Sequence, residues 1–280
     1  MKLSLAISTC PNDTFMFDAL IHKRIDTKGL SFDLQMADIE ELNGMTADQL
    51  NDITKISFFA FSKLTAHYQM LRSGAAIGFG NGPLIISKHK IYADELSQAR
   101  IAIPGENTTA NLLLNVLFPE SVDKKSYLFS DIEEAVLSGE VDAGLIIHET
   151  RFSYHKKGLK KVADLGELWE QKMQLPLPLG GIAIRRSLPD DVKQTIERLI
   201  SDSIRFAFQN PKASYDFVKK HARDLHDEVI KKHIDMYVNN YSIHCMDQGQ
   251  QAMEFIIDQA TKKRKTKPVQ PVFINTNKSK

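Results

Sequence analysis

Short apolar runs alternate with stretches of helical periodicity through the first two thirds of the chain. Apolar residues that are continuous or occupy every second position predict strands at residues 3–8, 30–36, 53–57, 83–87, 100–103 and 142–147. Apolar residues three or four positions apart predict helices at residues 15–22, 40–50, 58–67, 110–118 and 130–139, the last opened by a capping box of Ser130 and Glu133. This alternation predicts an α/β fold whose parallel sheets carry helices on both faces.

The last third of the chain is predicted to be mostly helical, with helices at residues 192–208, 215–221, 227–237 and 248–263. An apolar run at 180–184 follows Pro176 and Pro178, which suit a crossing segment, and the glycine-rich stretch 78–82 predicts a turn at an earlier crossing. We therefore expect two lobes that face each other across a central cleft. Lobe one would comprise residues 1–88 plus 181–280, and lobe two residues 89–180.

Composition narrows the class of protein. A chain of 280 residues exceeds the usual domain of roughly 100–200 residues, which agrees with two lobes. Its 36 basic and 35 acidic side chains give a net charge of +1, which argues against a nucleic-acid partner, so the basic run at 262–267 is interpreted as a solvated tail. Two cysteines fit a reducing compartment, and the apolar runs are too short for export or for crossing a membrane. These features predict a cytoplasmic protein with no membrane partner.

Three segments share one layout, in which a strand leads through a polar loop into the start of a helix. They lie at residues 8–14, 55–59 and 103–110. Helix N-termini carry unpaired N–H groups and partial positive charge, so three of them converging on a cleft suit a small anion. The candidate binding residues are Asn12, Asp13, Lys55, Ile56, Ser57, Thr108, Thr109 and Ala110. Ordinary helix capping, by Asn12 or Asp13 in the first loop and by Thr108 or Thr109 in the third, explains any single one of these loops more simply. Lys55 can equally be a surface lysine.

His148 is the more specific candidate, because it directly follows the apolar run 143–147. In α/β sheets, reactive groups lie at the carboxyl ends of strands, and histidine suits proton transfer near neutral pH. A structural histidine at a strand end explains the same position, and spacing alone does not separate the two. Neighbouring Glu149 would perturb His148, although adjacent strand residues point to opposite faces. No metal-binding or nucleotide-binding motif is present, and Cys10 has no identifiable base near it in the sequence.

Residues 8–15, which read Ser-Thr-Cys-Pro-Asn-Asp-Thr-Phe, resemble the N-terminal signature of 1,4-dihydroxy-6-naphthoate synthases of the futalosine route to menaquinone. Segments 55–57, 104–110 and 147–149 are similar to the other motifs of that family, in the same order. The resemblance covers most of the chain and is weakest beyond about residue 190. It implies a two-lobed fold like that of type II periplasmic binding proteins.

The resemblance also implies an activity. The implied activity is that of a carbon–carbon lyase, which converts cyclic dehypoxanthine futalosine to 1,4-dihydroxy-6-naphthoate. The substrate is a small molecule that carries a carboxylate, and no metal or organic cofactor is expected. The family's general base would fall on His148, and its substrate-binding positions on Lys55, Ile56 and Ser57 and on Thr109 and Ala110. The register of the last site is open by one residue, so Thr108 stays a candidate. Chorismate dehydratase and a non-catalytic anion-binding protein are the alternatives, and a homodimer is one option for the assembly.

Overall fold

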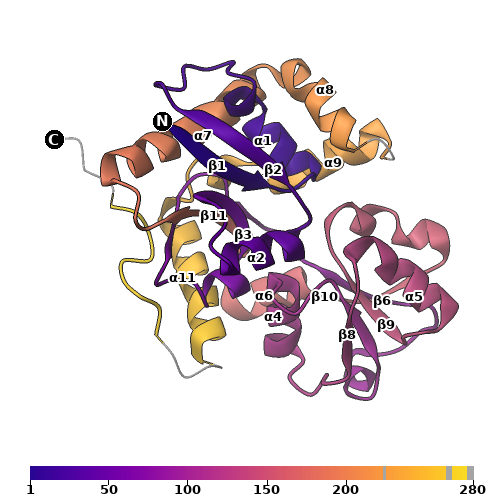
Figure 1. Cartoon of the computed structure of the whole chain (residues 1–280). Coiled ribbons are helices and arrows are strands. Elements are labelled where there is room, and N and C mark those ends of the chain that lie inside the picture. The colour runs from indigo at the N-terminus through magenta and orange to yellow at the C-terminus, as the bar shows by residue number, and fades with distance from the viewer. Residues whose placement is uncertain (223–224, 263–266, 276–280) are drawn as a thin grey trace.

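The structure, a computed structural model, describes residues 1–222, 225–262 and 267–275, and contains two sheets (Figure 1). The first sheet has the order β2-β1-β3-β11-β4, with β5 also paired to β11, and the second has the order β10-β6-β9-β7-β8. The strands of the first sheet are β1 (Lys2–Ile7), β2 (Ser31–Met36), β3 (Ile53–Ser57), β4 (Tyr68–Met70), β5 (Ala76–Gly78) and β11 (Leu177–Arg185). Those of the second are β6 (Leu84–Ser87), β7 (Ile101–Ile103), β8 (Lys124–Ser126), β9 (Ala143–Ile146) and β10 (Lys160–Asp164). The α/β class is confirmed.

Both sheets are mixed, so the expectation of parallel sheets is wrong in part. Strands β1, β2 and β3 are parallel, but β11 runs antiparallel to β3, β4 and β5. In the second sheet, β7, β8 and β9 are parallel, whereas β6 runs antiparallel to β9 and β10. The chain crosses from the first sheet to the second before β6, and it crosses back to the first sheet before β11. The direction of these two strands is therefore set by the crossing and not by a βαβ connection.

Among the described residues, nine of the eleven α-helices coincide with predicted ones, and the sixth and tenth were not predicted. The helices are α1 (Pro11–Ile21), α2 (Ile39–Ala47), α3 (Phe58–Phe61), α4 (Thr109–Leu117), α5 (Ile132–Ser138), α6 (Leu165–Met173), α7 (Asp190–Gln209), α8 (Pro211–His221), α9 (Asp227–Tyr237), α10 (Asn240–Ile243) and α11 (Met246–Lys262). The helix predicted at 58–67 is wrong beyond Phe61. There the carbonyl of Leu64 accepts hydrogen bonds from the backbone N–H groups of His67 and Tyr68, and this turn directs the chain into β4. Of the basic run at 262–267, the structure describes only residues 262 and 267, and the rest lies outside the described residues.

Helix α1 begins earlier than its expected caps. Pro11 occupies the first helical position and Cys10 is the N-cap, so Asn12 and Asp13 lie in the first turn. Proline suits this position because it has no N–H to leave unpaired and its φ is already helical. The expected capping by Asn12 or Asp13 is therefore wrong, and both side chains are free to make contacts outside the helix.

The capping box expected at Ser130 and Glu133 is also wrong. A 3-10 turn, Phe129–Asp131, precedes α5, and the Ser130 hydroxyl donates to the Asp131 carboxylate instead of accepting from the helix. The buried Glu133 carboxylate pairs with the Lys157 ammonium at 2.6 Å. The helix ends as predicted, at Gly139, whose φ of 79° is the left-handed conformation that glycine favours.

The chain crosses between the sheets earlier than the predicted boundary at residue 88. Strand β6 already belongs to the second sheet, and β11 belongs to the first from Leu177 onward, before the predicted return at 181. The first crossing is the glycine-rich turn predicted at 78–82. A Cβ on Gly82 would lie 2.2 Å from the backbone nitrogen of Gly166, so only glycine allows the two backbones to meet here.

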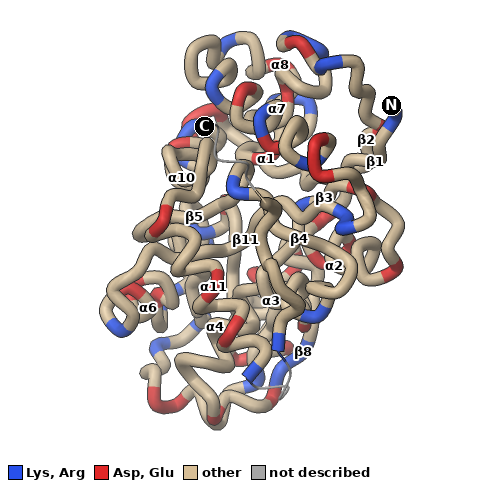
Figure 2. The backbone as a smooth tube through the Cα atoms, turned by 90° about the vertical axis from the view of Figure 1, so that its left-hand side faces the viewer, with Lys and Arg blue, Asp and Glu red and all other residues tan. Residues whose placement is uncertain are grey.

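One apolar core joins the two halves of the molecule. It includes Phe58 and Phe61 beside the first sheet, Leu113 and Trp169 beside the second, and Met253 of α11. In the described part of the chain, positions of Lys and Arg and positions of Asp and Glu are interspersed over the backbone (Figure 2). None of the described helices has the length and apolar character needed to cross a membrane.

Candidate active site

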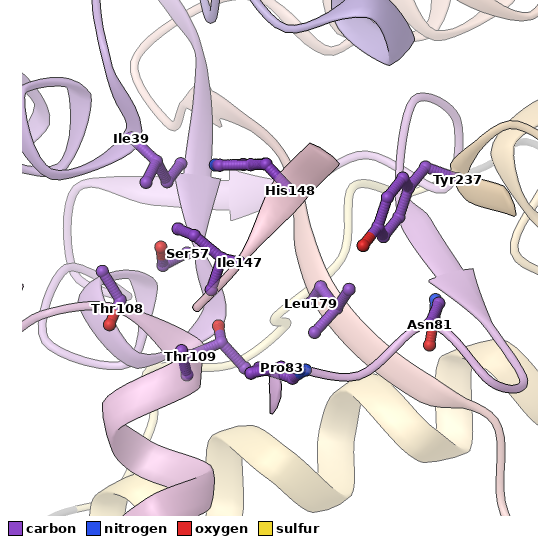
Figure 3. A pocket seen from close by; sticks show the side chains of 11 residues that line it. Ile39, Ser57, Asn81, Pro83, Thr108, Thr109, Ile147, His148, Leu179 and Tyr237 are labelled. Atoms are coloured by element: carbon purple, nitrogen blue, oxygen red, sulfur yellow. The ribbon is translucent and has the colours of Figure 1, made fainter. Parts of the chain in front are cut away.

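Two adjoining pockets lie where the predicted loops meet, and four residues line both of them: Ile39, His148, Leu179 and Tyr237. The first pocket (Figure 3) is completed by Ser57, Asn81, Pro83, Thr108, Thr109, Ala110 and Ile147. The second is completed by Ser8, Asn12, Asp13, Lys55, Ala76, Gly180 and His233. The structure therefore brings every predicted site residue except Ile56 to these pockets. The Ile56 side chain is fully buried in the apolar core, which leaves only its backbone for contact with a ligand.

His148 lies at the carboxyl end of β9, as predicted, and its half-buried ring forms part of both pockets. Its φ of 59° is left-handed, which is uncommon for a residue other than glycine and marks a local backbone strain. It opens a 3-10 turn, His148–Phe152, so the strand rule that would place Glu149 on the opposite face does not apply. The ring packs edge-on against Phe129, with centroids 5.2 Å apart.

The environment of His148 favours its neutral form. Burial lowers the pKa of the imidazole below its usual 6.5, and the negative charges of Glu149 and Asp13 oppose this shift. Its Nδ1 atom lies 3.7 Å from Sγ of Cys10, so the expectation that no base lies near this cysteine is wrong. Burial raises the pKa of the Cys10 thiol well above its usual value, and the charge of Glu149 adds to the shift. Cys10 is therefore a neutral thiol and not an activated nucleophile.

Asp13 and Lys55 form a buried ion pair in the wall of the second pocket. The Lys55 ammonium donates to Oδ1 of Asp13 at 3.0 Å, and the side chains are 7% and 0% exposed. The Asp13 carboxylate also accepts from the Ser8 hydroxyl at 2.7 Å and from the Asn12 amide at 2.9 Å. Lys55 is thus not a surface lysine. Its charge is already balanced by Asp13, which reduces what it can offer to an anion.

The two threonines at the start of α4 have different roles. The Thr108 hydroxyl donates to the carbonyl of Gly105 at 2.8 Å and caps α4 by accepting from the N–H of Asn111. The Thr109 hydroxyl accepts from the backbone N–H of Phe58 at 3.0 Å. This bond joins the start of α4, beside the second sheet, to α3, which follows the first sheet.

Replacing Thr109 with valine should lower the free energy of unfolding by about 1–3 kcal/mol. Valine has nearly the same shape but no acceptor, so the buried N–H of Phe58 is left unpaired. Urea unfolding measures the change, and Thr109→Ser, which keeps the hydroxyl, is the matched control. A valine variant as stable as the unaltered protein would show that this bond contributes nothing to stability.

Sequence reasoning missed the two ionisable side chains that α9 contributes to the pockets. His233 and Tyr237 lie one helical turn apart and are buried, with ring centroids 4.6 Å from each other. Burial raises the pKa of Tyr237 to about 12. The i, i+4 spacing placed the two on one face of a predicted helix, but nothing in the sequence indicated that this face meets His148. Among the described residues, no group of three histidine, cysteine or acidic side chains is placed to hold a metal ion.

The chain is similar to known proteins over nearly its whole length. A family model described as menaquinone biosynthesis matches residues 3–262. A protein from Thermus thermophilus named 1,4-dihydroxy-6-naphthoate synthase is 37% identical over 273 residues, which cover 97% of this chain and 99% of that protein. A protein of the same name from Streptomyces coelicolor is 37% identical over 264 residues, which cover 92% of each.

Solved structures agree with these relatives. A protein from Archaeoglobus fulgidus superposes with a TM-score of 0.88 at 37% identity, over 95% of this chain and 98% of that one. The periplasmic aliphatic sulphonate-binding protein of Escherichia coli, 12% identical, gives a TM-score of 0.65 over 100% and 95% of the two chains. The second likeness concerns the fold alone, and it confirms the predicted periplasmic-binding-protein-like architecture. The family match and the two relatives show that this chain belongs to the menaquinone-biosynthesis family.

Proposed function

We propose that the protein is a 1,4-dihydroxy-6-naphthoate synthase, a carbon–carbon lyase of menaquinone biosynthesis that acts on cyclic dehypoxanthine futalosine. The observation that carries this proposal is the 37% identity to a relative of that name over 97% of the chain. The pockets support it, since they adjoin and unite hydroxyl groups, the start of a helix and a neutral imidazole.

We assign the role of general base to His148. Its lowered pKa leaves the ring unprotonated at neutral pH, which is the form that accepts a proton. In the proposed step, the imidazole takes a proton from the substrate, and the electron pair left behind drives the breaking of a carbon–carbon bond. The aromatic naphthoate and the other cleavage fragment are released, and the imidazolium returns its proton to the fragment that receives the electron pair. The energy of aromatisation drives the step, and the apposed lobes exclude water while it occurs.

We assign the substrate's carboxylate to the first pocket, between Ser57 and the start of α4. The Ser57 hydroxyl accepts from the Asn43 amide at 3.2 Å, which leaves its own proton to donate. Thr109 likewise accepts from Phe58, whereas Thr108 already donates its proton to Gly105. These bonds favour Thr109 over Thr108 as the hydroxyl donor, and the N-terminal turn of α4 adds its partial positive charge. Ala110 forms part of the same wall.

The remaining predicted binding residues are assigned to the second pocket. Asn12, Asp13 and Lys55 form its polar wall, and Ile56 would contribute through its backbone only.

The cytoplasmic location stays part of the proposal. A homodimer stays one option for the assembly, which light scattering of the purified chain decides.

Activity should fall as the solution is acidified below neutral pH. The folded His148 has a pKa below 6.5, so the active neutral form is lost only as the pH drops through that lowered value. A profile of kcat/KM against pH should therefore be flat near neutrality and show its acid limb below pH 6.5. An acid limb centred above 6.5 would contradict a desolvated imidazole as the base.

Incubation with cyclic dehypoxanthine futalosine, followed by chromatography, tests the activity directly. The expected product is 1,4-dihydroxy-6-naphthoate, formed in repeated turnovers. Consumption of chorismate in a parallel assay would instead assign the protein to chorismate dehydration. Reversible binding of the futalosine derivative with no product would leave an anion-binding protein.

A further inference from the structure

His233 lies behind the proposed base and is completely buried. It belongs to α9, which contacts the turn that His148 opens, and it forms part of the second pocket. The rings of His148 and His233 are stacked, with centroids 6.2 Å apart and planes inclined by 21°. Neither the motifs nor the proposed chemistry accounts for a second imidazole at this position.

A chain of hydrogen bonds determines which nitrogen of His233 carries the proton. The Asn12 amide nitrogen donates to Oδ1 of Asp13 at 2.9 Å, so the amide oxygen faces away from that carboxylate. This oxygen lies 3.0 Å from Nε2 of His233. An amide oxygen only accepts, so Nε2 must carry the proton and donate it. Burial lowers the pKa of His233 well below its usual value, and the charges of His148 and Lys55 add to the shift. The ring is therefore neutral, and its Nδ1 atom is unprotonated.

The bare Nδ1 makes no hydrogen bond within the described residues. Its polar neighbour, Oε2 of Glu149, lies 3.9 Å away, beyond hydrogen-bonding distance. The contact through Nε2 is therefore the polar interaction that His233 makes in this structure. Its partner is the Asn12 amide, which in turn donates to the Asp13 carboxylate that holds the Lys55 ammonium.

We propose that His233 is a positioning residue, whose Nε2–H orients the Asn12 amide and thereby holds the Asp13–Lys55 pair in place in the wall of the second pocket. The assignment rests on the proposed function, because the wall it maintains is that of the proposed substrate site. Without this donor, the Asn12 oxygen is a buried acceptor with no partner. The amide is then held by its nitrogen alone, and a shift of its oxygen toward another donor would carry Asp13 and Lys55 with it, out of place relative to His148.

Two amide variants separate the two nitrogens of the ring. The amide of glutamine reaches about as far as Nε2, so His233→Gln retains the donor to Asn12. The amide of asparagine reaches only about as far as Nδ1, so His233→Asn loses that donor. We expect kcat/KM of the asparagine variant to be about tenfold below that of the glutamine variant, which corresponds to one hydrogen bond. The acid limb of the pH profile should be the same in both, because the role requires no titration of His233. His226→Gln, at an exposed position that caps the same helix, is the matched control.

Three results would overturn the proposal. Equal loss of activity in both variants would show that the imidazole itself is required. Full activity in both would show that the position is unimportant. Loss in the glutamine variant alone would show that the Nδ1 acceptor is the functional atom.

A stability measurement keeps the test independent of the activity. In a double-mutant cycle of His233→Asn and Asn12→Ala, the effects on urea unfolding should be strongly non-additive, because both changes break the same bond. Additive effects would overturn the hydrogen-bond chain, even if the asparagine variant were too unstable to assay. A wild-type protein without activity on the futalosine derivative would instead refute the proposed function, and the cycle would still test the chain.

Discussion

Replacing His148 with alanine should lower turnover by about 10²–10⁴-fold and leave the protein folded, because a general base typically contributes a factor of this size. The ring is the proton acceptor that both pockets share, and it is neutral at the pH of the assay. Steady-state kinetics on cyclic dehypoxanthine futalosine measures the effect. Loss of the base should act on kcat and kcat/KM together, because the proton is taken only in the transition state.

The backbone at His148 calls for a second variant. Its φ of 59° is disfavoured for alanine and better tolerated by asparagine, so His148→Asn should retain more stability than His148→Ala while being equally inactive. Exposed His89 provides the control, since His89→Ala should change neither activity nor the thermal midpoint. Near-normal turnover in a folded His148→Asn protein would remove His148 from the role of base.

Replacing Lys55 with methionine should lower the free energy of unfolding by about 3–5 kcal/mol, because it leaves the Asp13 carboxylate buried without its cation. Methionine resembles the lysine side chain in length and apolar character, so packing changes little. The Asp13 carboxylate is fully buried and keeps its bonds to Ser8 and Asn12, which compensate only part of the lost charge interaction.

The double variant Lys55→Met, Asp13→Asn identifies the cause. It removes both charges and should recover much of the stability that the single change loses. The exposed pair of Lys231 and Asp235, at 75% and 61% exposure, is the control, since Lys231→Met should cost less than about 1 kcal/mol. Urea unfolding curves measure all of these values. A double variant as unstable as the single one would show that lost packing, and not the unpaired charge, causes the effect.

Local patterns were sufficient wherever an element is decided by its own residues. Helix α9 was predicted with its observed bounds, and α7 and α11 to within two residues at each end that the structure describes. Long amphipathic helices are encoded by spacing alone. The short strands β4, β5, β8 and β10 were missed, as was helix α6. These strands have three to five residues, carry little periodicity and are stabilised by the strand they pair with, which lies far away in the sequence.

The same distinction holds for the candidate site. His148 was found because a buried strand ends directly before it, and the three polar loops were found because each links a strand to a helix. The sequence did not decide whether Thr108 or Thr109 is the binding hydroxyl, because the register of that site was uncertain by one residue. The distinction follows from hydrogen bonds to Gly105 and to Phe58, and the second of these partners lies 51 positions away.

By itself, the sequence determined the α/β class and the longer helices, and it marked His148 and the loops around it as candidates for the site. Each of these depends on residues that are close together in the chain. Only the tertiary structure decided that Asp13 neutralises Lys55, that β6 belongs to the second sheet, and that α9 places His233 and Tyr237 beside His148. Those features depend on contacts between segments tens of residues apart. Periodicity shows that such a segment has a face to bury, but not which face it meets.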